Sequence, residues 1–430
     1  MVIYVVQRGD TIGSIADKFG VTVFRLAQDN GLANPNELVE GQALVITYPY
    51  KTHLVEEGDT LSGIAQRYNI SLMQLYRNNP FLSDRDYIMP GEELVISYNT
   101  IGKTVVAGYA YPFINSGTLA KTLPYLTYLF IMNYKIIDEG NLLSSYDDTD
   151  IINQALSYAA IPIMGVTAVS PSGEMDVEAV FNLLINQSYQ ERFIDNIINR
   201  LRTSGYYGVN FFVSALSESN QTLYFELLRK LSNRIRSEGY LLFTTVNPGF
   251  AFSNSDVSFR RIDYSDVRNM VDGVIFIREL RAGFQGPPRP ITSVSISDEL
   301  FDYLIPTIPS ESIYIEIPLL SYDWELPYSS DTSIRCMALS SAVSLAYDVG
   351  AVIRFDENSM TPFFMYRNTY PLNQKDHIVW FIDARTINTM LHLAAGKCMA
   401  GASIWNIMIY FQQMWSVLVS QYDVIKYLPE

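Results

Sequence analysis

The 430-residue sequence predicts an α/β protein in which a (β/α)8 TIM barrel is preceded by two small βααβ modules. The first observation behind this prediction is that the opening hundred residues contain one pattern twice. The second is that, from Thr104 onward, short apolar runs alternate with longer helical patterns, as expected for parallel strands covered by helices. An open, doubly wound sheet is the alternative, and the missing Gly-rich phosphate loop disfavours it.

The repeat places Asp10 and Asp59 at equivalent positions, 59 − 10 = 49 residues apart. In each copy a short alternating strand leads into "GDTIGSIADKF" or "GDTLSGIAQRY", in which Asp or Thr caps a helix with apolar residues at helical spacing. A second short helix ends at Asn, and "GQALVI" or "GEELVI" supplies the closing strand. We therefore expect one module at residues 1–48 and another at residues 51–98.

These motifs closely resemble the LysM domain, a module that binds glycans containing N-acetylglucosamine, such as peptidoglycan and chitin. In that family the sugar lies between the loop after the first strand and the loop after the second helix. The resemblance implies glycan contacts from both loops in each module: Gly9, Asp10, Thr11, Ile12, Asn30, Gly31 and Leu32, and Gly58, Asp59, Thr60, Leu61, Asn79, Pro80 and Phe81. The residue types also allow a simpler role, with the aspartates as helix caps and Asn30 as a helix terminator. Two modules in tandem raise avidity for a polymer.

Residues 104–430 contain the runs expected of barrel strands. They are "TVVAGYAY", "TYLFIMNY", "IPIMGVTAV", "GVNFFV", "YLLFTTVNP", "DGVIFIREL", "SIYIEIPLL", "GAVIRF" and "GASIWNI". Helical stretches such as "QERFIDNIINRLRTSG" lie between them and stop at glycine. We expect eight βα units, with "AVIRFDENSMTPFFMYRN" as an extra excursion before the last strand.

Several segments resemble glycoside hydrolase family 18, in particular the LysM-bearing N-acetylglucosaminidases of bacterial spores that cut cortex peptidoglycan. These segments are "IPLLSYDWELP", "RFDENSMTPFF", "HIVWFIDART" and "ASIW". The resemblance covers essentially all of residues 104–430. It implies that Trp405 forms the floor of a sugar site and that the protein acts in the spore coat, the cortex or the cell wall.

The family motif DGxDxDxE on the fourth strand falls on Tyr207, Gly208, Asn210, Phe212 and Ser214. The glycine remains, Asn is tolerated at its position in the spore branch, and the carboxylates are missing. On the sixth strand Ile277 stands where the family has a tyrosine. A serine hydroxyl cannot replace the carboxylic acid that protonates the glycosidic oxygen, because its pKa is far too high. The resemblance therefore implies a barrel without an intact catalytic set.

Glu316 is the candidate for a relocated catalytic acid, since it alternates with Ile315 and Ile317 and is expected to face the barrel interior. The alternative is structural, with Glu316 paired to Arg278 of the neighbouring strand. Glu218 is expected to be a solvated loop residue. Asp323, Trp324 and Trp405 are expected to line the barrel pocket, where Asp323 and Glu325 contact sugar hydroxyls and the tryptophans stack on a pyranose ring, unless they are core residues.

Composition excludes several functions. The net charge of −15 and the pI near 4.7 leave no basic surface for nucleic acid. Cys336 and Cys398 indicate two buried free thiols, with one disulfide as the alternative, and three histidines leave little for a metal site, so no metal or cofactor is expected. The apolar segment "MAGASIWNIMIYFQQMWSVLVS" contains Asn and Gln in its middle and indicates a strand and helix rather than a membrane span.

The first residues, "MVIYVVQRGD", lack a basic region followed by a long apolar core, so no signal peptide is expected. The favoured interpretation is a glycan-binding protein with a catalytically silent barrel, made in the cytoplasm and deposited on the spore or cell wall. Its partner would be peptidoglycan or another N-acetylglucosamine polymer. The alternatives are an active N-acetylglucosaminidase that uses Glu316, and a scaffold that docks spore-coat proteins on a barrel filled by Phe212.

Overall fold

The computed structural model describes residues 1–85, 87–169, 176–213, 220–252, 257–277, 286–329, 332, 334–368 and 374–429. Its centre is a closed barrel of eight parallel strands, because β5 pairs with β20 on one side and with β6 on the other. The strands are β5 (Gly102–Ala110), β6 (Tyr128–Ile136), β8 (Ile161–Thr167), β9 (Gly208–Val213), β10 (Leu241–Val246), β13 (Gly273–Phe276), β14 (Ile313–Pro318) and β20 (Gly401–Trp405). The predicted TIM barrel is confirmed.

Side chains alternate along each strand between two apolar cores. On β9, Val209 and Phe211 point outward and join the large core under the helices. Phe212 points inward and packs with the side chains that fill the barrel. The barrel is therefore packed with side chains along its axis, as is usual for this fold.

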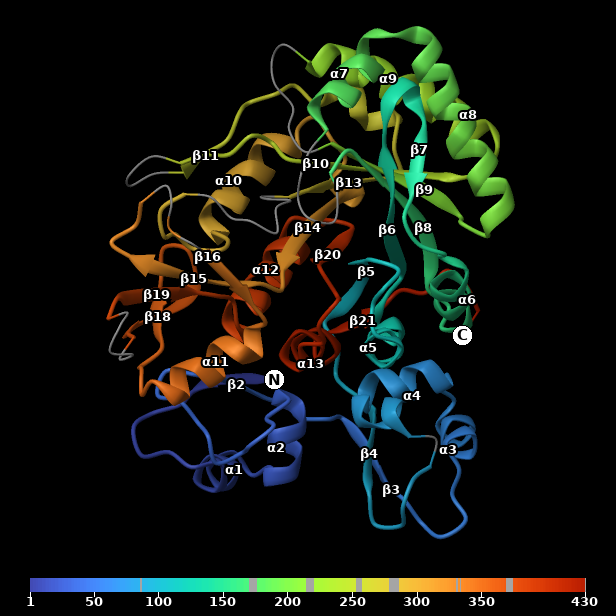
Figure 1. The fold of residues 1–430 in the computed structure, drawn as a ribbon. Helices are drawn as coiled ribbons and strands as arrows, with labels where there is room; N and C mark the ends of the chain where they lie inside the picture. Colours follow the sequence, from blue (N-terminus) through green and yellow to red (C-terminus); the bar gives the residue numbers. More distant parts are fainter. Residues whose placement is uncertain are drawn as a thin grey trace.

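Helices cover the outside of the barrel (Figure 1). They are α5 (Ser116–Thr122), α6 (Thr149–Ser157), α7 (Val177–Ile185), α8 (Gln187–Ser204), α9 (Gln221–Ser237), α10 (Val294–Leu304), α12 (Ala384–Gly396) and α13 (Gln412–Val419). The connection after β10 carries a small hairpin, β11 (Ala251–Phe252) with β12 (Val257–Ser258), and the 3-10 helix η4 (Ser265–Asn269). In its described part this connection has no α-helix, so the prediction of eight complete βα units is corrected there.

A separate five-stranded antiparallel sheet is inserted between β14 and α12. It contains β15 (Ser321–Leu326), β16 (Ile334–Met337), β17 (Arg354–Asp356), β18 (Thr361–Arg367) and β19 (Asp376–Trp380), with helix α11 (Leu339–Asp348) between β16 and β17. The predicted excursion at residues 351–368 is only part of this insertion. The sheet is larger because β15, directly after the barrel strand, pairs with the distant β19.

Both N-terminal modules have the predicted βααβ order. The first contains β1 (Val2–Val5), α1 (Ile12–Phe19), α2 (Val23–Asn30) and β2 (Ala43–Ile46); the second contains β3 (Lys51–Leu54), α3 (Leu61–Tyr68), α4 (Leu72–Asn78), the 3-10 helix η1 (Pro80–Asp84) and β4 (Glu93–Ser97). Thr11 and Thr60 cap the first helix of each module through their side chains. The aspartates of "GDT" therefore do not serve as the caps.

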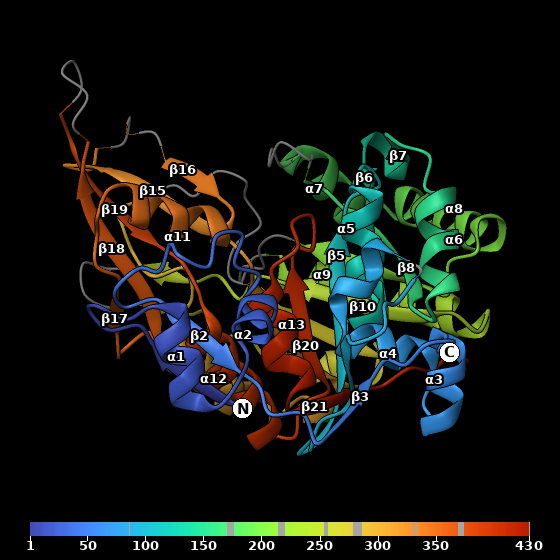
Figure 2. The same cartoon turned by 90° about the horizontal axis from the view of Figure 1, so that it is seen from below.

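The modules pack side by side against the barrel rather than extending from it (Figure 2). The first module lies beside α12 and α13, and Val39, Ala43 and Val45 belong to the core shared with the barrel. The backbone N–H of Ile353 donates to the carbonyl of Glu40 at 2.9 Å, which fixes the module edge to the insertion. In the second module, η1 lies against α5, and α4 lies against the 3-10 helix η2 (Leu123–Tyr125) that follows α5.

In the described part of the chain, no helix combines the length and the apolar composition needed to cross a membrane. Cys336 and Cys398 are free thiols, as predicted, but both are exposed, so the prediction that they are buried is corrected. Cys336 lies on a strand of the inserted sheet and Cys398 lies directly after α12, both at the surface of the molecule.

Candidate functional site

Strand β9 directs Asn210 and Phe212 into the barrel. Asn210 is fully buried, and its amide nitrogen donates to the Thr245 hydroxyl at 2.9 Å and to the Tyr109 hydroxyl at 3.2 Å. The Thr245 hydroxyl donates to the amide oxygen of Asn210 at 3.0 Å and lies 2.6 Å from the Tyr109 oxygen. The buried polar atoms of these three side chains therefore form hydrogen bonds with one another, as buried polar groups generally require.

Phe212 lies in the interior core of the barrel together with Tyr109 and Trp405. Its side chain is 1% exposed, and its ring centroid lies 6.3 Å from that of Tyr109 and 6.0 Å from that of Trp405. Ile277 is also fully buried in this interior core. Tyr207, by contrast, directly precedes β9 and is 43% exposed. An aromatic and an aliphatic side chain thus lie inside the barrel at Phe212 and Ile277, and that these two positions belong to a lost catalytic motif stays a prediction.

Glu316 faces the barrel interior, as its alternation predicts. It is 8% exposed and pairs in register with Ser403 of β20. Burial raises the pKa of the Tyr109 hydroxyl, and the nearby Glu316 charge adds a smaller rise. Ser214, Glu218 and Arg278 lie outside the described residues, so the predicted pair between Glu316 and Arg278 stays a prediction.

The predicted barrel pocket is corrected at two positions. Trp324 is fully buried on β15 of the inserted sheet, where its indole nitrogen donates to the Gly286 carbonyl at 3.2 Å. Asp323 on the same strand is 4% exposed and accepts hydrogen bonds from Tyr366 at 2.8 Å and from His377 at 3.0 Å. Neither side chain has a free face for a sugar.

Trp405 does lie at the end of β20, but it is 6% exposed and packs edge-on against Tyr109 at a centroid distance of 5.1 Å. The structure therefore places it in the interior core, which was the alternative left open for the tryptophans. Glu325, further along β15, forms an ion pair with Lys375 at the surface of the inserted sheet.

In the modules, the "GDT" aspartates organise the first loop. Asp10 accepts a hydrogen bond from the backbone N–H of Gln7 at 2.8 Å and from the Tyr4 hydroxyl at 2.7 Å, and both bonds lower its pKa. Asp59 accepts from the Glu56 N–H at 2.9 Å and lies 2.8 Å from His53 Nε2, and the backbone bond is the main cause of its lowered pKa. Gly9 and Gly58 in this loop have φ of 89° and 90°, and a β-carbon at either position would have no other atom within 4 Å.

The asparagines that end the second helices are structural. Asn30 donates to the carbonyls of Leu26 and Val45 and accepts from the Val45 N–H. Asn79 makes the same three bonds, with Leu75 and Val95. Their predicted side-chain contacts with sugar are corrected, because these amides already join the helix to the last strand of each module.

The remaining residues predicted to contact glycan lie either in the apolar cores of the modules or in the loops after the second helices. Ile12 and Leu61 are buried in the apolar cores of their modules. Leu32 and Phe81 pack at the edges of those cores, and Pro80 begins η1. Gly31 approaches the barrel so closely that a β-carbon there would lie 2.8 Å from Gln412 Cβ. The second loop of the first module therefore faces α13.

Sequence reasoning missed the interior network and the docking contacts. Tyr109 and Thr245 lie inside strand runs whose inward positions are readable from alternation, but their contact depends on the barrel closing between residues 136 positions apart. Among the described residues there is also no group of three or more His, Cys, Asp or Glu side chains that would hold a metal ion.

Comparison with known proteins confirms both resemblances. Residues 4–47 and 53–97 match the LysM domain, and residues 167–408 match glycosyl hydrolases family 18. The chain is 30% identical over 434 residues to the cortical fragment-lytic enzyme of Bacillus anthracis, with 99% of each chain covered. It is 27% identical to the putative sporulation-specific glycosylase YdhD of Bacillus subtilis, with 96% of each covered. The crystal structure of the Bacillus cereus spore cortex-lytic enzyme SleL matches with a TM-score of 0.79 at 29% identity, covering 99% of this chain and 98% of that one.

Proposed function

This chain belongs to family 18 of the glycosyl hydrolases, and from that premise we propose that it binds peptidoglycan through its two LysM modules with a barrel that does not hydrolyse it. The cortex-lytic names of its relatives support peptidoglycan as the polymer. The single observation that carries the proposal of silence is Phe212, which is buried between Tyr109 and Trp405 inside the barrel.

In this proposal the barrel lacks the carboxylic acid that would protonate the glycosidic oxygen. General acid catalysis is typically worth about 10² to 10⁴ in rate, which corresponds to about 3 to 5 kcal/mol of barrier. The motif position of the acid is Ser214, and a hydroxyl cannot donate its proton at a useful pH. Phe212 and Ile277 stand at the motif positions of two further polar groups, so the loss extends beyond a single group.

Glycan binding is assigned to the open first loops of the modules. Gly9 and Gly58 leave space beside the chain, and the aspartates that follow them are held by backbone and side-chain hydrogen bonds. A rigid loop with exposed backbone groups binds at a lower entropic cost than a flexible one. Two such loops on one molecule increase retention on a polymer through effective concentration.

The place of action follows from the relatives. Cortex-lytic and sporulation-specific names support the spore cortex, the spore coat or the cell wall as the location. Spore-coat proteins are then its neighbours and candidate partners. Co-sedimentation of the purified protein with intact spore envelopes, compared with envelopes stripped of coat proteins, tests whether retention depends on glycan or on coat.

Retention on purified sacculi is the direct test of glycan binding. The double variant Gly9→Glu and Gly58→Glu should release the full-length chain from sacculi, because it places bulk and charge in both first loops. Gly239→Glu is the matched control, since this glycine also has a positive φ of 81° and open space around it but lies outside the modules. Unchanged retention of the double variant would contradict the assignment of the loops.

Hydrolysis is tested separately, by incubating the wild-type protein with cortex peptidoglycan and measuring the release of reducing ends. No release above buffer is expected. The second candidate function, an active N-acetylglucosaminidase, is supported by the position of Glu316, a buried carboxylate that faces the barrel interior. Release that disappears in Glu316→Gln would establish that function in place of the silent barrel.

A further inference from the structure

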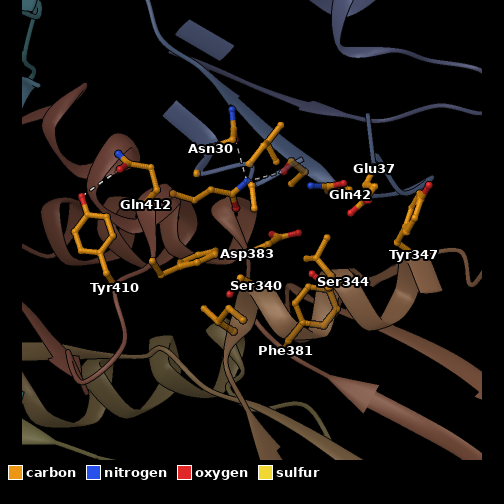
Figure 3. A pocket seen from close by; sticks show the side chains of 18 of the residues that line it. Asn30, Glu37, Gln42, Ser340, Ser344, Tyr347, Phe381, Asp383, Tyr410 and Gln412 are labelled. Atoms are coloured by element: carbon orange, nitrogen blue, oxygen red, sulfur yellow. Dashed lines mark hydrogen bonds between the residues drawn. The ribbon is translucent and has the colours of Figure 1, made fainter. Parts of the chain in front are cut away.

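The first module and the barrel enclose a cavity of about 350 Å³ (Figure 3). Its described lining contains one cation, Lys121, and two carboxylates, Glu37 and Asp383. Residues 30–32, which belong to a loop predicted to contact glycan, also line it. A ligand in this cavity therefore falls under the glycan binding already proposed.

A different cavity, of about 480 Å³, lies between the second module and the end of the barrel where β5 begins. One wall comes from α4, β4 and the residues that follow β4. The other comes from the start of β5, from β21 (Tyr422–Val424) and from the residues directly after β21. Neither loop of the second module that was predicted to contact glycan contributes to its described lining. We call it the basal cavity.

The basal cavity is rich in positive charge. Three of its described lining residues are cations, Arg77, Lys103 and Lys426, and one is an acid, Asp423, which accepts a hydrogen bond from the Thr100 hydroxyl at 3.0 Å. This balance is opposite to the net charge of −15 of the whole chain and to the balance in the cavity beside the first module. Charges in a recessed site are screened less than exposed ones, and they attract an ion of opposite sign more strongly. The basal cavity therefore favours an anion.

Two of the cations are held in place by backbone carbonyls. Arg77 on α4 is 8% exposed, and its Nη1 donates to the Pro124 carbonyl of η2 at 3.2 Å. The ammonium of Lys426 donates to three backbone carbonyls, those of Leu123, Leu126 and Tyr158, at 3.1, 2.5 and 3.0 Å. Positive charges that are already positioned bind an anion at a lower entropic cost than mobile ones.

Other polar groups on the walls can contact an anion directly. The side chains of Gln74, Ser97 and Lys103 make no hydrogen bond or ion pair with any residue in the described part of the chain. They supply an amide, a hydroxyl and an ammonium donor from α4, β4 and β5. Tyr422 also borders the cavity and is 5% exposed, and its hydroxyl has no hydrogen-bond partner among the described residues. A buried hydroxyl in this state gains from an acceptor oxygen.

We infer that the basal cavity binds a small anion with several phosphate or carboxylate oxygens. Lys103, Gln74 and Ser97 contact these oxygens, while Arg77 and Lys426 stabilise the negative charge. The volume lies within the range of sites for small ligands, and a long polyanion is disfavoured by the net negative charge of the chain. The bound anion ties the second module to the barrel, and its binding does not depend on the proposed glycan binding.

The test uses the full-length protein, with sodium phosphate and sodium citrate as separate probes in titration calorimetry at an ionic strength held constant with sodium chloride. Lys103→Gln removes a positive charge at an exposed position, and Lys18→Gln is its matched control at an exposed position of the first module. Gln74→Glu places a carboxylate in the cavity without changing the size of the side chain. Gln66→Glu is the same change at an exposed position of the second module outside the lining.

The wild type should bind one equivalent of at least one probe, and binding should raise its urea denaturation midpoint, because a ligand that binds only the folded state stabilises it. Lys103→Gln and Gln74→Glu should each weaken binding about tenfold or more, whereas both controls should bind as the wild type does. Binding of only one probe would identify phosphate or carboxylate as the group recognised. A wild type that binds neither probe would overturn the inference, as would equal affinities in the wild type, Lys103→Gln and Gln74→Glu.

Discussion

The amide oxygen of Asn30 accepts a hydrogen bond from Nε2 of Gln413 at 3.0 Å, which joins the first module to helix α13 across a chain separation of 383 residues. The same nitrogen donates to the Ala43 carbonyl at 2.8 Å. Asn30 therefore holds the module together and also holds the module to the barrel. Asn79 of the second module makes the same internal bonds but has no equivalent of Gln413 among the described contacts.

This difference predicts coupling in a double-mutant cycle. Asn30→Ala and Gln413→Ala should be non-additive by about 0.5 to 3 kcal/mol, because they share a hydrogen bond. Asn79→Ala combined with Gln413→Ala should be additive. Urea denaturation midpoints of the single and double variants measure both quantities. Additivity in the Asn30 cycle would show that the contact contributes nothing to stability.

Docking of the first module should depend on Gly41. Its φ is 86°, and a β-carbon would lie 1.8 Å from the Ile353 carbonyl oxygen, so Gly41→Ala should separate the module from the insertion. Gly91, at the equivalent place in the second module, has a φ of 89° and open space. Gly91→Ala should therefore cost only the backbone strain, about 1 to 2 kcal/mol.

Small-angle scattering distinguishes the two outcomes. Gly41→Ala should have a larger radius of gyration than the wild type, while Gly91→Ala should remain as compact. If both variants keep the wild-type radius of gyration, the close approach of Gly41 is not what fixes the module.

The barrel and the modules could be predicted because the sequence patterns that indicate them lie within single strands or within one repeat. Alternation on β9 correctly placed Asn210 and Phe212 inside the barrel, and the repeated "GDT" and Asn patterns gave both modules. Docking could not be predicted, because the contact between Gly41 and Ile353 joins distant segments through backbone atoms that carry no sequence pattern. Trp324 was misplaced for a related reason, since the pairing of β15 with β19 takes it out of the barrel.

Asp29 gives a prediction about pH. Burial raises the pKa of this carboxyl to about 6, although the Arg25 charge and the Thr47 hydroxyl both lower it. In the unfolded chain the pKa is about 3.9. Between these values the folded protein holds a proton that the unfolded chain has lost, so the free energy of unfolding falls as pH rises from about 4 to about 6.

Asp29→Asn should remove that fall and stabilise the protein by up to about 3 kcal/mol at pH 7. The second module already carries Asn78 at the equivalent position, where it donates to the Ile96 carbonyl at 2.9 Å. Denaturation midpoints measured from pH 4 to 7 test this. Asp263→Asn is the control, and its effect on the free energy of unfolding should have the opposite sign. A backbone hydrogen bond from Ser265 lowers the pKa of Asp263, so the ionised carboxylate stabilises the fold at neutral pH and its loss should destabilise the protein there. Parallel pH profiles of wild type and Asp29→Asn would contradict the prediction.

The last prediction concerns the barrel strand itself. The triple variant Phe212→Asp, Ser214→Glu and Ile277→Tyr places polar groups at the family's motif positions. Its stability should fall by a few kcal/mol, about 3 to 5 for the loss of the Phe212 ring alone, because Tyr109 and Trp405 pack around that ring. If the variant folds, weak but measurable cleavage of a fluorogenic N-acetylglucosamine oligomer is expected, against none by the wild type.

The matched control is the same triple variant with Ser214→Gln in place of Ser214→Glu, which keeps the size of the side chain and removes its acid. A folded triple variant no more active than this control would mean that the packing around Tyr109 and Trp405 closes the pocket to sugar. The scaffold interpretation would then be favoured, because a barrel whose interior excludes sugar can act only through its outer surface, by binding other proteins. Wild-type cleavage that disappears in Glu316→Gln would instead identify Glu316 as the acid, since it is the buried carboxylate described at the interior wall of the barrel.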